Sequence, residues 1–114
     1  MKLSVIIVNF NVRYFLEQAV SSALEALHGL DAELIVVDNA SSDDSAQMMG
    51  DVFPEVQYIY LDQNLGFSKA NNVGIQASKG EYVLLLNPDT VVAEDAFAKS
   101  IQFMDAHPDA GGLG

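Results

Sequence analysis

The chain has 114 residues, of which 16 are acidic and 5 basic, so its formal net charge is −11. This length allows one domain with a sizeable core, and so acidic a surface makes nucleic acid and anionic membranes poor partners. The chain has no cysteine, which excludes disulfides and thiolate metal sites.

The first part of the chain alternates strand and helix patterns. Residues 3–8, LSVIIV, predict a buried strand, and Asn11 is a candidate N-cap for a helix that Gly29 would close. Residues 34–37 predict a second buried strand, which ends at Asp38. The apolar residues of the helix recur every three or four positions: Val12, Phe15, Leu16, Ala19, Val20, Ala23, Leu24 and Leu27.

The segment NASSDDS follows the second strand and predicts the start of a second helix. Ser41 and Ser42 are candidate N-caps, and Asp43 and Asp44 would lie in the first turn, where the helix dipole favours acidic residues. Pro54 would end this helix.

The next elements repeat the alternation. Residues 56–61 predict a third strand, and residues 68–79 predict a helix that Gly80 would end. Residues 82–86, YVLLL, form an unalternated apolar run, which is typical of a strand buried on both faces in a parallel sheet.

This fourth strand breaks abruptly into the polar sequence NPDT. Ligands bind at the carboxyl ends of parallel strands, so Asp89 lies where it could take part in ligand binding or catalysis. The alternative is that Asp89 or Thr90 only caps the next helix. Residues 92–106 predict that helix. The glycine-rich ending at residues 111–114 resembles the entrance to a further strand, which suggests that the chain is a piece of a longer protein.

The βαβαβαβα pattern predicts an α/β fold with a doubly wound, mainly parallel sheet in the strand order 3-2-1-4. In that order residues 9–11, Asp38 and residues 87–89 would converge on one crevice. The alternative is that these are the ordinary polar strand ends of any α/β protein.

Several sequence motifs are absent, and their absence reduces the number of ligand classes that the crevice could bind. The segment NFNVRYF after the first strand lacks the glycines of a dinucleotide site, and no P-loop motif is present. An aspartyl-phosphate phosphatase would need an aspartate after the first strand, and a serine hydrolase would need a nucleophile elbow and a suitable histidine. His28 and His107 fall near helix ends and are expected to face solvent. The ligand class that remains is a nucleotide whose phosphates are held by a metal. A divalent cation bound by carboxylates would offset the repulsion between the acidic chain and the phosphates.

Four segments carry a resemblance that covers nearly all of the chain: SVIIVNFN, IVVDNASSDDS, NLGFSKANNVGI and LLLNPDT. Together they resemble the N-terminal half of a family 2 glycosyltransferase, the inverting GT-A type with a Rossmann-like donor half that uses nucleotide-diphospho-sugars. The amino-acid sequences of these segments are similar to those of the rhamnosyltransferase-like branch. The resemblance implies a UDP-, GDP- or dTDP-sugar donor and transfer to an acceptor hydroxyl in cell-surface polysaccharide synthesis.

The resemblance also implies roles for particular residues. Val8 and Phe10 would line the base and ribose pocket, and Asp38 would bond the base edge. Asp89, as the last acid of the family's DxD-type motif, would coordinate Mg²⁺ or Mn²⁺ on the diphosphate. The other two acids of that motif are replaced by Asn87-Pro88, which reduces the number of carboxylate ligands.

Three further residues complete the implied donor site: Lys69, Asn72 and Asn87. Lys69 would supply positive charge near the diphosphate, because Asn71 stands where the branch commonly has an arginine; a solvent-facing lysine is the alternative. Asn64, Gly66 and Gly74 are expected to be loop and packing residues.

The family's acceptor site and catalytic base follow the metal motif, so no catalytic residue is assigned in this chain, which is expected to be inactive alone. A glycan or lipid-linked acceptor would bind the full-length protein. The absence of an apolar span and of a basic leader predicts a cytoplasmic protein, with a peripheral location at the inner membrane face open for the full-length form. The fourth strand would become a sheet edge prone to self-association. The alternative function is a non-catalytic α/β module that binds a nucleotide or a protein.

Overall fold

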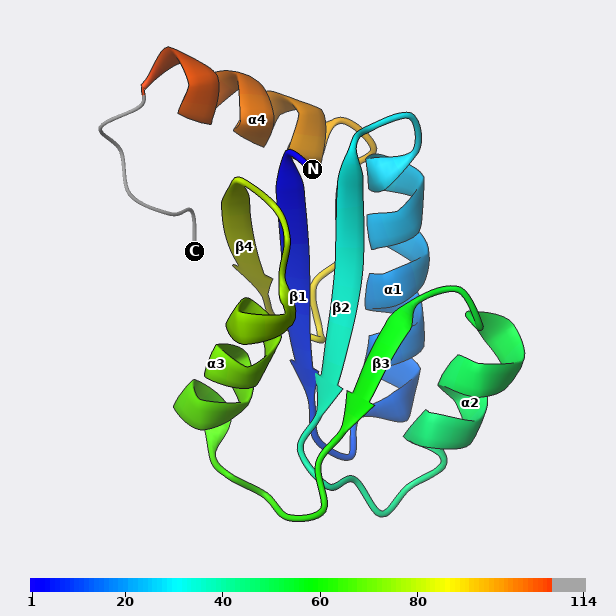
Figure 1. The fold of residues 1–114 in the computed structure, drawn as a ribbon. Helices are drawn as coiled ribbons and strands as arrows, with labels where there is room; N and C mark the ends of the chain where they lie inside the picture. The colour runs from blue at the N-terminus through cyan, green and yellow to red at the C-terminus, as the bar shows by residue number, and fades with distance from the viewer. Residues whose placement is uncertain (108–114) are drawn as a thin grey trace.

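The computed structural model describes residues 1–107, in which strands and helices alternate along the chain (Figure 1). The strands are β1 (Leu3–Asn9), β2 (Ala32–Asp38), β3 (Gln57–Tyr60) and β4 (Tyr82–Leu86). The helices are α1 (Arg13–Leu27), α2 (Ser45–Val52), α3 (Phe67–Ala77) and α4 (Ala96–Ala106). The predicted βα alternation is confirmed. Within the described residues, none of these helices has the length and apolar character that crossing a membrane requires.

The four strands form one parallel sheet in the order β3-β2-β1-β4, which is the predicted order. The β1 and β2 strands pair from Leu3 opposite Ala32 to Asn9 opposite Asp38. In Figure 1 the carboxyl ends of the strands lie at the same end of the molecule as the first turns of α1, α2 and α3. This arrangement gathers polar strand ends and helix N-termini at one edge of the sheet.

Helices cover the two faces of the sheet unequally. On one face, side chains of β1 and β2 pack against α1, α2 and α4, whose largest fully buried side chains include Leu16, Met49 and Phe97. The other face carries α3 and a smaller cluster: Ile6, Val8, Ile35, Val37 and Ala70. The central strands are therefore buried on both faces, whereas β4, at the margin, has one buried residue, Leu84.

The α3 helix lies close to the sheet because it carries a glycine at the point of contact. A Cβ atom on Gly74 would come within 2.6 Å of the Ile6 Cγ2 atom and 3.2 Å of the Val37 Cγ2 atom. The predicted packing role of Gly74 is confirmed. The glycine at position 80 is required in a similar way, because a Cβ there would lie 2.5 Å from the Ser4 backbone nitrogen.

The last helix is shorter than predicted, because it begins at Ala96 and not at Val92. The Val92 backbone N–H donates to the Ser22 hydroxyl of α1 at 3.0 Å, which holds this segment against α1 and outside the helix. Two β-branched residues, Val91 and Val92, also disfavour a helical start. The further strand predicted from residues 111–114 lies outside the described residues.

Candidate functional site

A shallow pocket of about 330 Å³ lies at the carboxyl edge of the sheet. Its lining comes from the end of β1, the loops after β1, β2 and β3, the start of α3 and the turn after β4. The lining residues are Val8, Phe10, Val12, Asn39, Asn64, Phe67 and Pro88. Most of this surface is apolar, and two of the seven residues are aromatic, which suits a flat ring more than a charged group.

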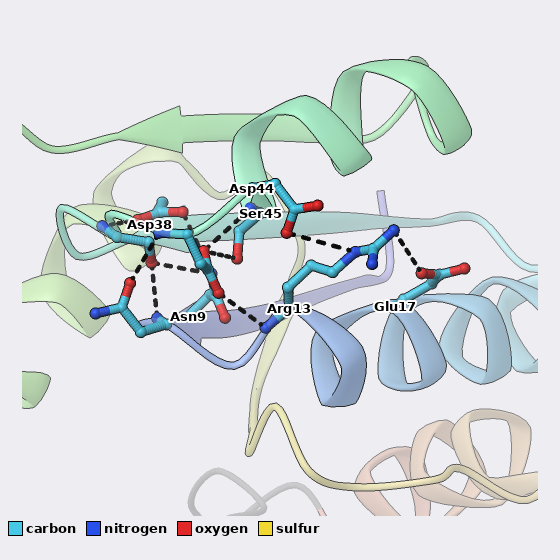
Figure 2. A network of polar contacts seen from close by, with 9 residues as sticks. Asn9, Arg13, Glu17, Asp38, Asp44 and Ser45 are labelled. Atoms are coloured by element: carbon cyan, nitrogen blue, oxygen red, sulfur yellow. Dashed lines mark hydrogen bonds and ion pairs between the residues drawn. The ribbon is translucent and has the colours of Figure 1, made fainter.

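Asp38, the last residue of β2, is fully buried next to this edge. Its Oδ1 atom accepts a hydrogen bond from the Ser41 backbone N–H at 2.6 Å. Its Oδ2 atom accepts one from the Asn9 side-chain amide at 3.2 Å and another from the Tyr58 hydroxyl. Figure 2 shows Asp38 and Asn9 within this network. Three donors therefore compensate the carboxylate inside the protein, and no part of the side chain is exposed to a ligand.

The tyrosines of β3 anchor the loop that follows β2. Burial, together with the hydrogen bond to Asp38, raises the pKa of the Tyr58 hydroxyl far above its ordinary range, so the hydroxyl stays protonated and donates. The Tyr60 hydroxyl donates to the Ser41 backbone carbonyl at 3.1 Å. These two contacts hold the start of the loop against the sheet.

Asn11 joins the loop after β1 to the loop after β2. Its side-chain oxygen accepts hydrogen bonds from the backbone N–H groups of Ser42 (2.7 Å) and Asp43 (3.2 Å), and its own N–H donates to the Ser41 hydroxyl at 2.9 Å. The prediction that Asn11 caps the first helix is therefore wrong: α1 begins after Val12 without a side-chain cap. Asn11 adopts a φ of 54°, a left-handed conformation that asparagine tolerates better than most residues.

The predicted caps of the second helix are also wrong. The α2 helix begins at Ser45, so Ser41 and Ser42 lie in the preceding loop, and Asp43 and Asp44 precede the first turn. Burial by itself would raise the pKa of the Asp43 carboxyl, but hydrogen bonds from the Ser45 hydroxyl and backbone outweigh it and lower the pKa. Asp43 therefore stays ionised and holds the turn into α2.

Arg13 closes the far side of this polar network (Figure 2). Its guanidinium lies 3.6 Å from Glu17 Oε1 and 3.8 Å from Asp44 Oδ1, and its backbone N–H donates to Asp43 Oδ2 at 3.2 Å. These contacts link the first turn of α1 to the loop before α2. The guanidinium is therefore engaged with carboxylates of its own chain.

Asp89 lies in a reverse turn after β4. The Thr90 backbone N–H donates to the Asn87 carbonyl at 3.1 Å, and Pro88 occupies the second position, which its fixed φ favours in such turns. The alternative that Asp89 or Thr90 caps a helix is wrong, because α4 begins only at Ala96 and has Asp95 as its N-cap. The Asp89 carboxylate is exposed and makes no hydrogen bond or ion pair within residues 1–107.

The structure separates the seven predicted site residues into three groups. Val8 and Phe10 line the pocket, and 47% of the Phe10 surface is exposed. Asp38 is buried beside it. The side chains of Lys69 and Asn72 on α3, and of Asn87 and Asp89 after β4, are exposed and outside the pocket lining. Their predicted contacts with a ligand stay predictions.

Sequence reasoning missed Asn39 and Phe67 as pocket residues and treated Asn64 only as a loop residue. Asn64 does stabilise its loop, because its side-chain oxygen accepts the Gly66 N–H at 2.8 Å. No periodic pattern could identify Asn39, since it follows the strand and precedes Ala40, whose φ of 66° redirects the chain. Phe67 was detectable as a large apolar residue at a polar helix start.

Comparison with known proteins identifies the family. The model of the family described as "Glycosyl transferase family 2" matches residues 4–113. The chain belongs to glycosyltransferase family 2. This family 2 chain is 32% identical over 102 residues to the succinoglycan biosynthesis protein ExoO of Rhizobium meliloti, covering 89% of the chain and 29% of ExoO. It is 28% identical over 113 residues to the poly-beta-1,6-N-acetyl-D-glucosamine synthase of Staphylococcus epidermidis, covering 97% of the chain and 27% of that enzyme.

Solved structures agree with this family 2 assignment. The chain superposes on S. aureus TarS 1-349 in complex with UDP-GlcNAc with a TM-score of 0.83 and 26% sequence identity, covering 95% of the chain and 32% of the TarS chain. The predicted GT-A fold is confirmed by this match and by the strand order. The chain spans less than half the length of the relatives and of TarS.

Proposed function

We propose that the pocket at the carboxyl edge binds the nucleotide of a nucleotide-diphospho-sugar, and that the whole protein transfers this sugar to an acceptor hydroxyl with inversion. One observation carries the proposal: the pocket residue Pro88 is followed directly, in the same turn, by Asp89, whose carboxylate is exposed and has no partner within residues 1–107. An apolar pocket suits a base, and an unpartnered carboxylate suits a metal on its diphosphate.

Different residues would contact different parts of the donor. The rings of Phe10 and Phe67 offer flat apolar surface for stacking, and Val8 would contact the base or ribose. Asn87 would approach the diphosphate or sugar, and Lys69 and Asn72, one turn apart on α3, would approach the diphosphate from the other side. The first turn of α3 adds the partial positive charge of a helix N-terminus.

Asp89 is the candidate metal ligand. The net charge of −11 opposes diphosphate binding, and no group of three or more metal-ligating side chains occurs among residues 1–107. A single exposed carboxylate nevertheless fits Mg²⁺ or Mn²⁺, since such ions commonly use one or two carboxylates together with substrate phosphates and water. When bound, the ion would neutralise charge on the diphosphate leaving group.

No residue of this chain is assigned as the general base or as part of the acceptor site. The relatives extend well beyond the segment that the chain matches. We therefore propose that the corresponding part of the whole protein supplies the base and binds a glycan or lipid-linked acceptor. The names of ExoO and of the glucosamine polymer synthase support a role in cell-surface polysaccharide synthesis.

Calorimetric titration with UDP-, GDP- and dTDP-sugars, with and without Mn²⁺, tests the proposal. We expect at least one donor to bind, and to bind about tenfold or more tightly with the ion present, because the side chains offer the diphosphate little positive charge. Asp89→Asn should abolish the metal-dependent part and leave binding of the nucleoside nearly intact.

The matched control is Asp51→Asn, which removes an exposed carboxylate from α2 and should change nothing. Tight binding of a nucleoside diphosphate by the parent chain without metal would reject the role of Asp89. It would instead move the phosphate site to the helix N-termini and Lys69. Failure of every donor to bind would reject the proposed function itself.

A further inference from the structure

A groove of about 420 Å³ lies at the amino edge of the sheet, where the end of α1 meets the starts of β2 and β3. In Figure 1 the end of α1 and the start of β2 lie at the opposite end of the molecule from the loops that follow β1 and β2. A ligand in this amino-edge groove would therefore leave the pocket at the carboxyl edge free. The larger apolar side chains of the groove are those of Leu24, Leu27, Leu34 and Val56, and its acidic residues are Glu33 and Glu55.

The apolar core of the molecule reaches the surface in the amino-edge groove. Leu27, Leu34 and Val56 belong to the main core cluster, and Leu24 packs against it. The exposed fractions of Leu27, Leu34 and Val56 are 8%, 6% and 9%, whereas most residues of the same cluster are exposed by 3% or less. An apolar side chain placed in the groove would extend this core and remove the remaining surface from water.

Negative charge lies beside the apolar part of the groove. The Glu33 Oε2 atom accepts hydrogen bonds from the Ser4 hydroxyl at 2.6 Å and the Lys79 backbone N–H at 2.7 Å, which hold its carboxylate in place. Glu55 is exposed and makes no ion pair within residues 1–107. No lysine or arginine of that range lines the groove. The α1 helix ends there without a basic residue in its last turn, so the negative end of its dipole adds to the two carboxylates.

We propose that the amino-edge groove docks a basic segment of a partner protein, one that carries a lysine or arginine next to a large apolar side chain. The cationic group would pair with Glu33 and Glu55, and the apolar side chain would cover the leucine and valine floor. Charge complementarity selects this partner, because an acidic segment would be repelled and a purely polar one would leave the floor exposed to water. This interaction surface goes beyond the proposed function and does not depend on it.

Chemical-shift mapping of the ¹⁵N-labelled chain with three acetylated and amidated peptides tests the proposal. The peptide LKKLLK carries both the charge and the apolar side chains, GKKGGK carries the charge alone, and LEELLE carries the apolar side chains with the opposite charge. We expect LKKLLK to move the backbone signals of Leu27, Leu34, Val56 and Gln57, which line the groove, and to bind about tenfold or more tightly than GKKGGK. LEELLE should move none of these signals.

A pair of charge reversals separates the groove from the general acidity of the chain. Glu55→Lys should weaken the binding of LKKLLK about tenfold, because it reverses the unpaired charge at the groove. Asp62→Lys is the matched control, since it makes the same change in net charge at an exposed position in the loop after β3, outside the groove lining. It should change the affinity by no more than about twofold, because distant exposed charges are screened by salt. Both substitutions are at exposed positions, so both variants should fold.

Several outcomes would overturn the proposal. No shift of the groove signals with LKKLLK would reject it outright, and equal affinities of LKKLLK and GKKGGK would mean that the apolar floor plays no part. Equal weakening by the two charge reversals would mean that the attraction is nonspecific. Tighter binding of the free polyamine spermidine than of LKKLLK would assign the groove to a small cation. Movement of the same signals with protein concentration, without peptide, would assign it to a second copy of the chain.

Discussion

At the scale of single residues, Asp38 shows how a buried carboxylate can serve a site without an exposed atom. Its three donors come from β1, β3 and the loop after β2, so its charge ties these segments together. A direct bond from Asp38 to a base would require this network to open. The residue that lines the pocket is the next one, Asn39, and the network around Asp38 holds it there.

Asp38→Asn should therefore act first on stability. The substitution keeps the shape but turns one oxygen into a donor that faces other donors, so we expect the free energy of unfolding to fall by about 1–3 kcal/mol. Urea unfolding measures it, with Asp51→Asn on the exposed surface of α2 as a control that should stay within about 0.5 kcal/mol of the parent. Unchanged stability combined with lost nucleotide binding would instead favour direct contact of Asp38 with the base.

The sequence predicted some residues of the pocket and missed others for a physical reason. Val8 and Phe10 were predicted only through the family resemblance; Val8 ends the first predicted strand, and Phe10 follows it in the loop. Asn39 lies where the chain leaves the sheet, and its direction depends on the left-handed Ala40 and on hydrogen bonds to Asn9 and Leu65. Such distant partners cannot be read from local pattern.

At the scale of secondary-structure elements, the contact between α3 and the sheet decides how the start of α3 meets the pocket. Gly74 faces Ile6 and Val37 at the point of closest approach. Phe67, two turns earlier on the same helix, lines the pocket. The helix can bring Phe67 to the pocket only while the glycine contact lets it lie low on the sheet.

Gly74→Ala should destabilise the chain although alanine favours helices. A new Cβ would lie 2.6 Å from Ile6 Cγ2, so overpacking should cost about 1–3 kcal/mol and exceed the roughly 1 kcal/mol that alanine gains in a helix. Thermal unfolding measures the sum. Gly50→Ala is the matched control, because Gly50 lies in α2 with nothing within 4 Å of its Cβ position, and it should raise stability. A stabilising Gly74→Ala would contradict the close contact.

Element type was predictable where apolar periodicity was strong, and element ends were not. The β4 strand was predicted with its observed bounds because a run of apolar residues lies between polar residues. The start of α4 and the caps of α1 and α2 were wrong, because Ser22, Asn11 and Ser41 make hydrogen bonds to other segments. Tertiary contacts therefore overrode the local capping preferences.

At the scale of the whole molecule, β4 is an edge strand, and no strand among residues 1–107 pairs with its outer edge. The Tyr82 N–H donates to the Lys2 carbonyl, so in a parallel ladder the backbone groups of Val83 and Leu85 point to the free edge of β4. The strand carries no charge, proline or bulge that would deter pairing with another chain. The other edge strand, β3, is shorter and has exposed Gln57 and Tyr60 at its ends.

The 114-residue chain should therefore self-associate through β4. Sedimentation velocity should show a dimer or larger species whose fraction grows with concentration, because an open apolar edge pairs readily with a second copy. Leu85→Lys should reduce this association. Gln57→Lys adds the same charge to the opposite edge strand and should leave it unchanged. A monodisperse monomer of the parent at high concentration would contradict this prediction.

The central claim is that the pocket at the carboxyl edge of the sheet is the nucleotide site, and amide chemical-shift mapping tests it most directly. Titration of the ¹⁵N-labelled chain with UDP and the diamagnetic ion Mg²⁺ should move the backbone signals of Val8, Phe10, Asn39, Leu65 and Phe67 more than those of the remaining described residues. A second pocket, lined by Arg13, Tyr14, Glu17, Gln18, Ser21, Ser22, Glu25 and Val91, provides the internal comparison. Shifts confined to that second pocket, or no shifts at saturating UDP, would contradict the account.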